Sequence, residues 1–136
     1  KINLNEIIKN QLTFFSEQAL SKKIIITTEL AEEIIVNSNH ILAEMLISNL
    51  FLNAINHNIL KGKIFVKLTK DRIIFSNTGA LLPLQKEKMF ERFSKSNPTS
   101  QGNGLGLSII KKIVDTNHWA INYHFKENFH TFEIVF

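Results

Sequence analysis

The chain has 136 residues, a length typical of one domain, and a formal net charge of +4 at pH 7. It contains no cysteine, which excludes disulfides, thiolate zinc sites and cysteine nucleophiles. Its apolar runs are far too short to span a membrane, and its lysines are spread out, which favours a solvated surface over a nucleic-acid-binding patch. Because the first residue is Lys1 rather than methionine, we expect the chain to be part of a longer protein.

The first half of the sequence predicts two helices with two short strands between them. Apolar residues at helical spacing begin at Leu4, and either Asn3 or Asn5 is a suitable cap for this helix. The β-branched stretches 23–28 and 34–36 predict strands. The polar cluster 37–39 then precedes a second helical pattern over 41–58. One broad face of that helix carries Ile41, Leu42, Met45, Leu46, Asn49, Leu52, Asn53 and Asn56.

The second half of the sequence predicts two hairpins and further helical segments. Strands are expected at 63–68, 72–76, 119–125 and 129–136, with helices at 84–93 and 105–117. Residues 77–79 end the second of these strands, and the polar segment 94–103 predicts a loop. This mixed order of helices and hairpins is typical of an α+β fold. We expect a two-layer sandwich in which helices cover one face of the sheet.

The helix over 41–58 carries a polar row that an apolar helix does not need. Asn49 and Asn53 are four residues apart, so they share one helix face, and His57 continues the row. Each buried amide needs a partner, and one interpretation is that these side chains bond to neighbouring backbone. The row as a whole favours a wet cleft. An amide oxygen suits Mg²⁺, which takes few protein ligands and completes its shell with water and substrate phosphates.

A glycine-rich stretch, Gly102-Asn103-Gly104-Leu105-Gly106-Leu107, leads directly into the helix over 105–117. Backbone N–H groups at such a helix start can meet a phosphate, although a loop of this kind is often only a tight turn. The preceding loop is longer than the usual connection between helices. It is either a lid, from which Lys95 and Gln101 would reach phosphate oxygens, or an ordinary surface connection.

The segment Asn77-Thr78-Gly79 follows a predicted strand and has two interpretations. Taken alone, it is typical of a turn. In a nucleotide site, Asn77 would offer its amide to an adenine edge, and Gly79 would let the backbone approach the ring.

Taken together, these blocks resemble the catalytic and ATP-binding domain of sensor histidine kinases, within the GHKL ATPase superfamily. Residues 49–57 resemble the N box, 76–79 the first glycine box, 89–93 the F box and 102–107 the second glycine box. The likeness runs from about Leu4 to Phe136. It implies a single domain over 1–136, with residues 1–3 as the end of a linker. It also implies a mixed sheet of about five strands under three helices, with ATP between the helices and a flexible lid.

The resemblance also implies roles for individual residues. Asn53 would be the Mg²⁺ ligand, Asn49 would lie beside it near the phosphates, and these two would serve catalysis. Phe90 and Phe93 would pack the base of the lid. The implied nucleotide-binding set is Asn49, Asn53, Asn56, His57, Asn77, Gly79, Lys95, Gly102, Asn103, Gly104, Leu105, Gly106 and Leu107.

Three positions depart from the family pattern. Asn77 stands where the family has aspartate, Leu81 replaces the second glycine of the first glycine box, and Asn56 stands where lysine is common. The side-chain oxygen of Asn77 can still accept a hydrogen bond, but without charge. Because the N-box asparagines and all three lid glycines are present, we expect a variant site that still binds nucleotide.

The implied function is that of an ATP-dependent protein-histidine kinase lacking its own phosphoacceptor. The domain would present Mg·ATP to a histidine on a separate dimerisation domain of the same protein, which would signal to a response regulator. We expect a monomeric cytoplasmic fragment without nucleic-acid partners, from a homodimeric parent anchored in the bacterial inner membrane. Two alternatives stay open: a non-catalytic, nucleotide-gated interaction module, and a serine kinase of the anti-sigma-factor type. Gyrase-, chaperone- and mismatch-repair-type ATPases are disfavoured, because they carry a glutamate base where Asn49 stands.

Overall fold

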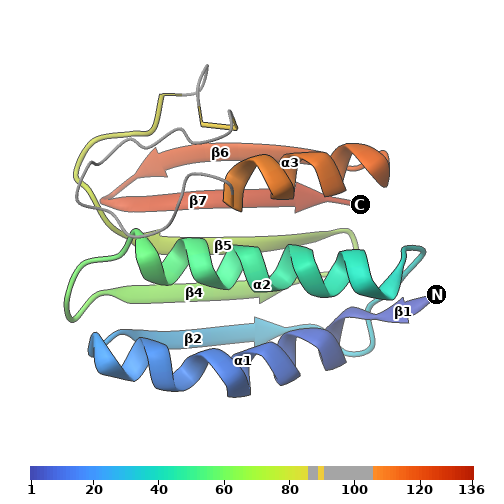
Figure 1. Cartoon of the computed structure of the whole chain (residues 1–136), viewed down its shortest axis with the longest axis horizontal. Coiled ribbons are helices and arrows are strands. Elements are labelled where there is room, and N and C mark those ends of the chain that lie inside the picture. The colour runs from blue at the N-terminus through green and yellow to red at the C-terminus, as the bar shows by residue number, and fades with distance from the viewer. Residues whose placement is uncertain (86–88, 91–105) are drawn as a thin grey trace.

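Helices and strands alternate along the chain in the mixed order that the sequence predicts (Figure 1). The structure is a computed structural model, and it describes residues 1–85, 89–90 and 106–136. Within these ranges, no helix is long and apolar enough to cross a membrane. The elements are β1 (Ile2–Asn3), α1 (Leu4–Ser21), β2 (Ile25–Leu30), β3 (Ile35–Val36), α2 (His40–Asn56), β4 (Lys63–Leu68), β5 (Arg72–Thr78), α3 (Gly106–Thr116), β6 (Ala120–Lys126) and β7 (Phe129–Val135).

The main sheet has five strands in the order β2-β4-β5-β7-β6. β2 runs parallel to β4, and each of the other neighbouring pairs is antiparallel. α1, α2 and α3 all lie on one face of this sheet (Figure 1). The predicted α+β two-layer sandwich, with a mixed five-stranded sheet under three helices, is therefore confirmed. β3 lies outside the main sheet and pairs with β1, a two-residue strand that the sequence did not indicate.

The core lies between α2 and the two central strands. Every second residue of β4 and β5 is buried, and the register places Val66 opposite Phe75 on the helix side. Phe75 meets Phe51 of α2 edge-on, with ring centroids 5.0 Å apart, and Phe51 stacks on Phe15 of α1 at 5.5 Å. Truncating a buried phenylalanine to alanine costs about 3–5 kcal/mol. This aromatic row therefore holds α2 firmly over the middle of the sheet.

The core face of α2 differs from the broad face expected from its sequence. Ile41 and Met45 are exposed, at 65% and 41%, whereas Asn49 and Asn53 are half-buried at the margin of the packed face. The buried residues of the helix are Ala43, Leu46, Ile47, Leu50, Phe51, Ala54 and Ile55. α2 packs against both α1 and α3, so most of its circumference is apolar. The pattern alone could not identify which face meets the sheet.

Asparagine side chains fix the starts of the first two helices. Asn3 caps α1 by accepting from the Glu6 N–H at 3.3 Å, and Asn39 caps α2 by accepting from the N–H groups of Ile41 and Leu42. The other candidate cap, Asn5, is buried inside α1. It donates to the Ala31 carbonyl at 2.5 Å and accepts from the Ile34 N–H at 2.7 Å, a long-range tie between α1 and the loop before β3.

A small polar cluster joins the end of α2 to the β4–β5 pair. Thr78 Oγ1 donates to Asn58 Oδ1 at 2.6 Å and accepts from the Lys63 N–H at 2.8 Å. Asn58 Nδ2 in turn donates to the Lys63 carbonyl at 3.1 Å. Gly62 lies against this cluster, and a Cβ there would collide with the Asn58 side chain and Thr78 Oγ1. Only glycine fits at this position without breaking the tie between α2 and the sheet.

We expect Gly62→Ala to lower the free energy of unfolding by about 1–3 kcal/mol, because the added methyl overpacks the cluster. Chemical denaturation measures the change, which should appear as a lower midpoint concentration of denaturant with an unchanged m-value. Lys61→Gly is the matched control. Lys61 adopts φ 62°, a left-handed conformation that glycine tolerates better, so this neighbouring change should leave stability unchanged or raise it. Equal stability of Gly62→Ala and the parent chain would contradict the packing argument.

Candidate nucleotide-binding site

Three elements bring the predicted site residues together. In Figure 1, α2 and β5 end on the left-hand side, and α3 begins near the middle of the view and runs to the right. α2 supplies Asn49, Asn53 and Asn56, and β5 supplies Asn77. The asparagine row of α2 therefore lies near the end of β5, although the two segments are far apart in the sequence.

Asn49 faces the start of α3. Its amide nitrogen donates to the Met45 carbonyl at 2.7 Å, which turns the amide oxygen away from its own helix. A Cβ built on Gly106 would lie 3.6 Å from that oxygen, an ordinary van der Waals distance. The N-box row and the last glycine of the second glycine box are therefore neighbours in space, as the resemblance implies. Leu107 follows in the first turn of α3 and is half-buried.

Asn53 and Asn56 are both half-buried near the end of α2. Within the described part of the chain, the side chain of Asn53 forms no hydrogen bond, so its amide is not committed to the fold. His57 ends the helix as its C-cap, and its N–H bonds to the Asn53 carbonyl at 3.1 Å. The row Asn49–Asn53–His57 is thus present in space, with Asn53 at its centre.

Asn77 belongs to β5 rather than to a turn, so the expectation that residues 77–79 end this strand is corrected. β5 continues through Thr78 because β7 pairs with it to the end, with Asn77 opposite His130. Asn77 is 2% exposed and lies on the helix side of the sheet. Its amide nitrogen donates to the Thr78 carbonyl at 2.8 Å, which identifies the other amide atom as the oxygen. A buried acceptor group is therefore presented at the end of the central strand.

Gly79 lies where the chain leaves β5. A Cβ at this position would lie 2.6 Å from the carbonyl oxygen of His57 and 3.3 Å from Cδ2 of His130. The absence of a side chain lets the end of α2 and the end of β5 approach closely. The predicted approach of this backbone to an adenine ring stays a prediction. Leu81 has no positive φ and is 70% exposed, so a side chain is tolerated where the family has its second glycine.

A hydrogen-bonded chain that the sequence did not indicate ties down the loop after Gly79. His130 Nε2 donates to the Ala80 carbonyl at 2.6 Å, and the Tyr123 hydroxyl donates to His130 Nδ1 at 2.7 Å while accepting from the Leu84 N–H at 2.9 Å. A carbonyl can only accept, so Nε2 of His130 carries a proton, and in the neutral ring Nδ1 is then the acceptor for the Tyr123 hydroxyl. Burial lowers the pKa of His130 and raises that of Tyr123, which keeps both groups uncharged. Tyr123 and His130 lie in the two predicted strands of one hairpin, 119–125 and 129–136. The alternating pattern of these strands was the signal from which their proximity could have been inferred.

Several expected site residues lie outside the part of the chain that the structure describes. They are Lys95, Gln101, Gly102, Asn103, Gly104 and Leu105, together with Phe93 of the F box. Of the short helix expected over 84–93, Leu84 and Gln85 belong to neither a helix nor a strand, and residues 89–90 form a turn in which the Met89 N–H bonds to the Gln85 carbonyl. Met89 is buried and Phe90 packs against the core, so the described part of the F box is anchored to the fold.

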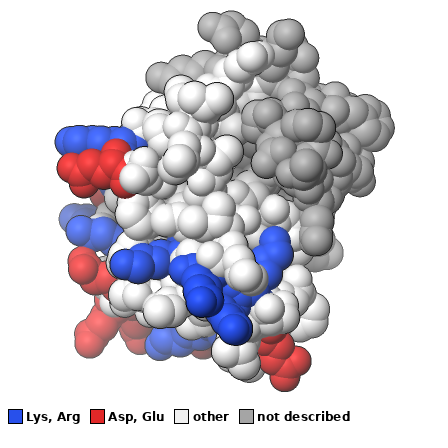
Figure 2. Space-filling view, turned by 90° about the vertical axis from the view of Figure 1, so that its left-hand side faces the viewer, with Lys and Arg blue, Asp and Glu red and all other residues white. Residues whose placement is uncertain are grey.

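A group of basic side chains lies at the end of the molecule where α1 and α2 end. Figure 2 shows this end face on, with Lys and Arg side chains gathered in its lower half and carboxylates towards its left and lower margins. Lys22, Lys23, Lys61 and Lys63 lie where α1 and α2 end and β4 begins, and the Lys61 N–H bonds to the Lys22 carbonyl at 2.8 Å. Lys22 Nζ also donates to the Ile55 carbonyl at the end of α2. No ion pair among the described residues neutralises these four. Their field favours an approaching polyphosphate.

The side chains at this site suit a hard cation that takes few ligands from the protein. They do not form a metal site with many protein ligands. Among the residues that the structure describes, no three His, Asp or Glu side chains gather to hold a metal. The uncommitted amide of Asn53, beside that of Asn49, fits an octahedral cation that takes most of its ligands from phosphates and water. The residues present therefore fit Mg²⁺ as part of a nucleotide complex.

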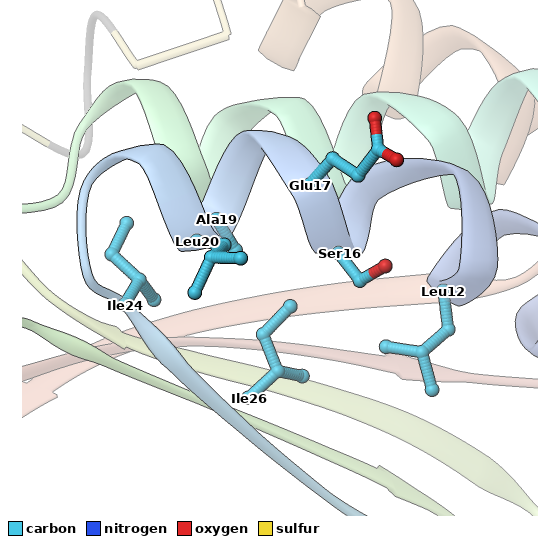
Figure 3. Close-up of a pocket in the computed structure, with 7 residues that line it drawn as sticks. All are labelled: Leu12, Ser16, Glu17, Ala19, Leu20, Ile24 and Ile26. Atoms are coloured by element: carbon cyan, nitrogen blue, oxygen red, sulfur yellow. The ribbon is translucent and has the colours of Figure 1, made fainter.

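A cleft of about 350 Å³ between α1 and β2 is a poor candidate for the same role (Figure 3). Its lining is mostly aliphatic, and Glu17 is its charged residue. The carboxylate of Glu17 repels a polyphosphate, and the aliphatic groups offer it neither charge nor hydrogen bonds. The residues that line it are Leu12, Ser16, Glu17, Ala19, Leu20, Ile24 and Ile26. The convergent amides at the ends of α2 and β5 remain the better site.

Comparisons with known proteins show which family the chain is similar to. The heme sensor protein HssS of Staphylococcus aureus (strain Newman) is 36% identical over 128 residues, which cover 90% of this chain and 28% of HssS. The chain therefore spans less than a third of the length of this relative. The nucleotide-free catalytic domain of histidine kinase ThkA superimposes with a TM-score of 0.85 at 29% identity, covering 98% of this chain and 91% of that domain.

A second structure of ThkA, in complex with the response regulator protein TrrA, matches with a TM-score of 0.76 at 29% identity and covers 98% of this chain and 40% of that one. The family model for histidine kinase-, DNA gyrase B- and HSP90-like ATPases matches residues 38–133, which include α2, β5 and α3 and thus all three elements of the site. The chain belongs to this ATPase family.

Proposed function

We propose that this chain is the ATP-binding catalytic domain of a protein-histidine kinase, and that it presents Mg·ATP to a histidine on a separate domain. The observation that carries the proposal is the approach of Gly106 to the amide oxygen of Asn49. It places the first turn of α3 beside the polar row of α2, where phosphates would lie against both. Calorimetric titration with ATP, with and without Mg²⁺, tests the proposal, and absence of binding would refute it.

In this proposal, each element has a separate task. The backbone N–H groups at the start of α3 bind phosphate oxygens, and the amide oxygen of Asn53 holds Mg²⁺. Asn77 accepts a hydrogen bond from the adenine amino group, and Gly79 admits the ring. When bound, Mg²⁺ neutralises charge on the transferring phosphoryl group. The rest of the task is positioning, because phosphoryl transfer requires little covalent chemistry from the protein.

We expect Asn77→Ala to weaken adenine-nucleotide binding by about tenfold, since the loss of one hydrogen bond to a buried partner costs about 1–3 kcal/mol. Asn77→Asp should retain or strengthen binding, because the carboxylate supplies the same acceptor with a charge. Calorimetry on the two variants and the parent chain measures the difference. Unchanged affinity of Asn77→Ala would place adenine recognition elsewhere.

A non-catalytic, nucleotide-gated interaction module is the second candidate. Asn77, Leu81 and Asn56 favour it, since each replaces a residue that the active family uses. The affinity for Mg·ATP separates the candidates, because a site disabled at all three positions would bind Mg·ATP weakly, whereas a working kinase site would retain binding. A serine kinase of the anti-sigma-factor type is the third candidate. The described part of the F box argues against it, because Met89 is buried and Phe90 packs against the core.

The proposed partners follow from the proposed reaction. A phosphorylated histidine on a dimerisation domain of the same protein would pass its phosphoryl group to a response regulator. The complex of ThkA with TrrA supports such a partner for this chain. We place the domain in the cytoplasm, where ATP is available, within a homodimeric parent at the bacterial inner membrane.

A further inference from the structure

The loop 79–84 is attached to the sheet at two points by a pair of side chains. His130 on β7 donates to the Ala80 carbonyl at 2.6 Å, and Tyr123 on β6 accepts from the Leu84 N–H at 2.9 Å. The two side chains are themselves joined by a hydrogen bond of 2.7 Å. The loop therefore has one hydrogen bond near each end, and both lead to the same joined pair, which we call the Tyr123–His130 clamp.

Between its two attachment points, the loop 79–84 has little other support. Leu81 and Leu82 lie between its two attachment points and are 70% and 76% exposed, so the middle of the loop gains little from packing. Tyr123 and His130 are 7% and 5% exposed, and neighbouring rings hold them in place: Phe132 lies 5.0 Å from Tyr123 between ring centroids, and Phe125 lies 4.6 Å from His130. A rigid pair thus holds a loop that would otherwise be loosely held.

The position of the clamp connects it to the proposed nucleotide site. His130 is directly opposite Asn77 in the β5–β7 pairing, and its Cδ2 lies 3.3 Å from where a Cβ would stand on Gly79. The loop that the clamp holds begins at Gly79, beside the buried amide of Asn77. Its arrangement therefore decides the shape of the adenine end of the site, although neither clamp residue needs to touch the ligand.

We propose that Tyr123 and His130 are positioning residues for nucleotide binding: they hold the loop 79–84 in the arrangement that receives the adenine end of ATP. The inference rests on the proposed function and adds to it two residues outside the four family boxes. A ligand that binds one loop arrangement has an apparent affinity reduced by the fraction of molecules in that arrangement. The clamp raises this fraction before the nucleotide arrives.

The first variant removes the hydroxyl alone. Tyr123→Phe keeps the buried ring and deletes the hydrogen bonds to His130 and to the Leu84 N–H. We expect ATP and ADP to bind about fivefold to tenfold more weakly, equally for both and independently of Mg²⁺, because the clamp acts at the adenine end. Amide hydrogen exchange at Leu84 should accelerate in the same variant, while the thermal midpoint confirms that the chain remains folded.

A second pair of variants separates positioning from packing. His130→Gln retains an N–H that can donate to the Ala80 carbonyl and should bind ATP within about threefold of the parent chain, whereas His130→Leu fills the space without a donor and should lose about tenfold. A purely structural role predicts the reverse order, since leucine suits a buried site better than glutamine. His124→Leu is the control, because His124 is exposed on the neighbouring strand and faces away from the clamp.

The outcomes distinguish the clamp from the proposed function. If the parent chain binds no adenine nucleotide, the proposed function is refuted and the clamp with it. If the parent chain binds ATP and Tyr123→Phe binds it equally tightly, or if His130→Leu binds better than His130→Gln, the clamp alone is overturned. Weakened, Mg²⁺-independent binding in Tyr123→Phe together with retention in His130→Gln supports it.

Discussion

Asn53→Ala is expected to abolish Mg²⁺-dependent ATP binding, with the affinity for Mg·ATP falling about 100-fold or more. The amide of Asn53 is half-buried and forms no hydrogen bond within the described part of the chain, so its removal costs the fold little. Alanine is also the better helix former at this position in α2. The loss should therefore appear in calorimetry with Mg·ATP and leave the thermal midpoint of the free chain nearly unchanged.

Two further variants make this result specific to the metal. Asn53→Asp keeps an oxygen ligand and should preserve the difference between titrations with and without Mg²⁺. Asn10→Ala makes the same substitution at an exposed position of α1 and should bind like the parent chain. If folded Asn53→Ala binds Mg·ATP as tightly as the parent chain, Asn53 is not the metal ligand.

The sequence predicted the sheet better than it predicted the packing of α2. Alternating burial in β4 and β5 follows from a sheet with one covered face, so the pattern specifies which side of each strand is inside. α2 is apolar around most of its circumference, and its packed face depends on where α1 and α3 lie. That arrangement is set by contacts between distant segments, and a local pattern does not contain it.

The part of the candidate site that depends on residue spacing along one helix could be predicted from the sequence. The part that depends on the pairing of β5 with β7 could not. Asn49 and Asn53 share a helix face by their spacing alone. The continuation of β5 through Thr78, by contrast, depends on β7 pairing with it, because Asn-Thr-Gly by itself favours a turn. The same pairing places His130 opposite Asn77, so the proposed Tyr123–His130 clamp is visible only in the folded chain.

The chain is expected to bind ATP without phosphorylating itself. Transfer needs a histidine nitrogen in line with the γ-phosphate, at about 3–3.5 Å. Both ring nitrogens of His130 are hydrogen-bonded, and His40 lies at the exposed start of α2, where it meets Glu44 at 3.4 Å. His57 shares a helix face with the proposed metal ligand Asn53, so it is better placed to contact the bound nucleotide than to attack it in line.

Incubation with γ-labelled ATP, followed by acid treatment, measures this directly, because a phosphohistidine is lost in acid and a phosphoserine is not. The full-length parent protein, which in our proposal carries the acceptor histidine, should acquire acid-labile label under the same conditions. Acid-stable label on the isolated chain would favour the serine-kinase alternative. Stoichiometric acid-labile label on the isolated chain would instead show that one of its own five histidines is the acceptor, and that the separate-domain arrangement is wrong.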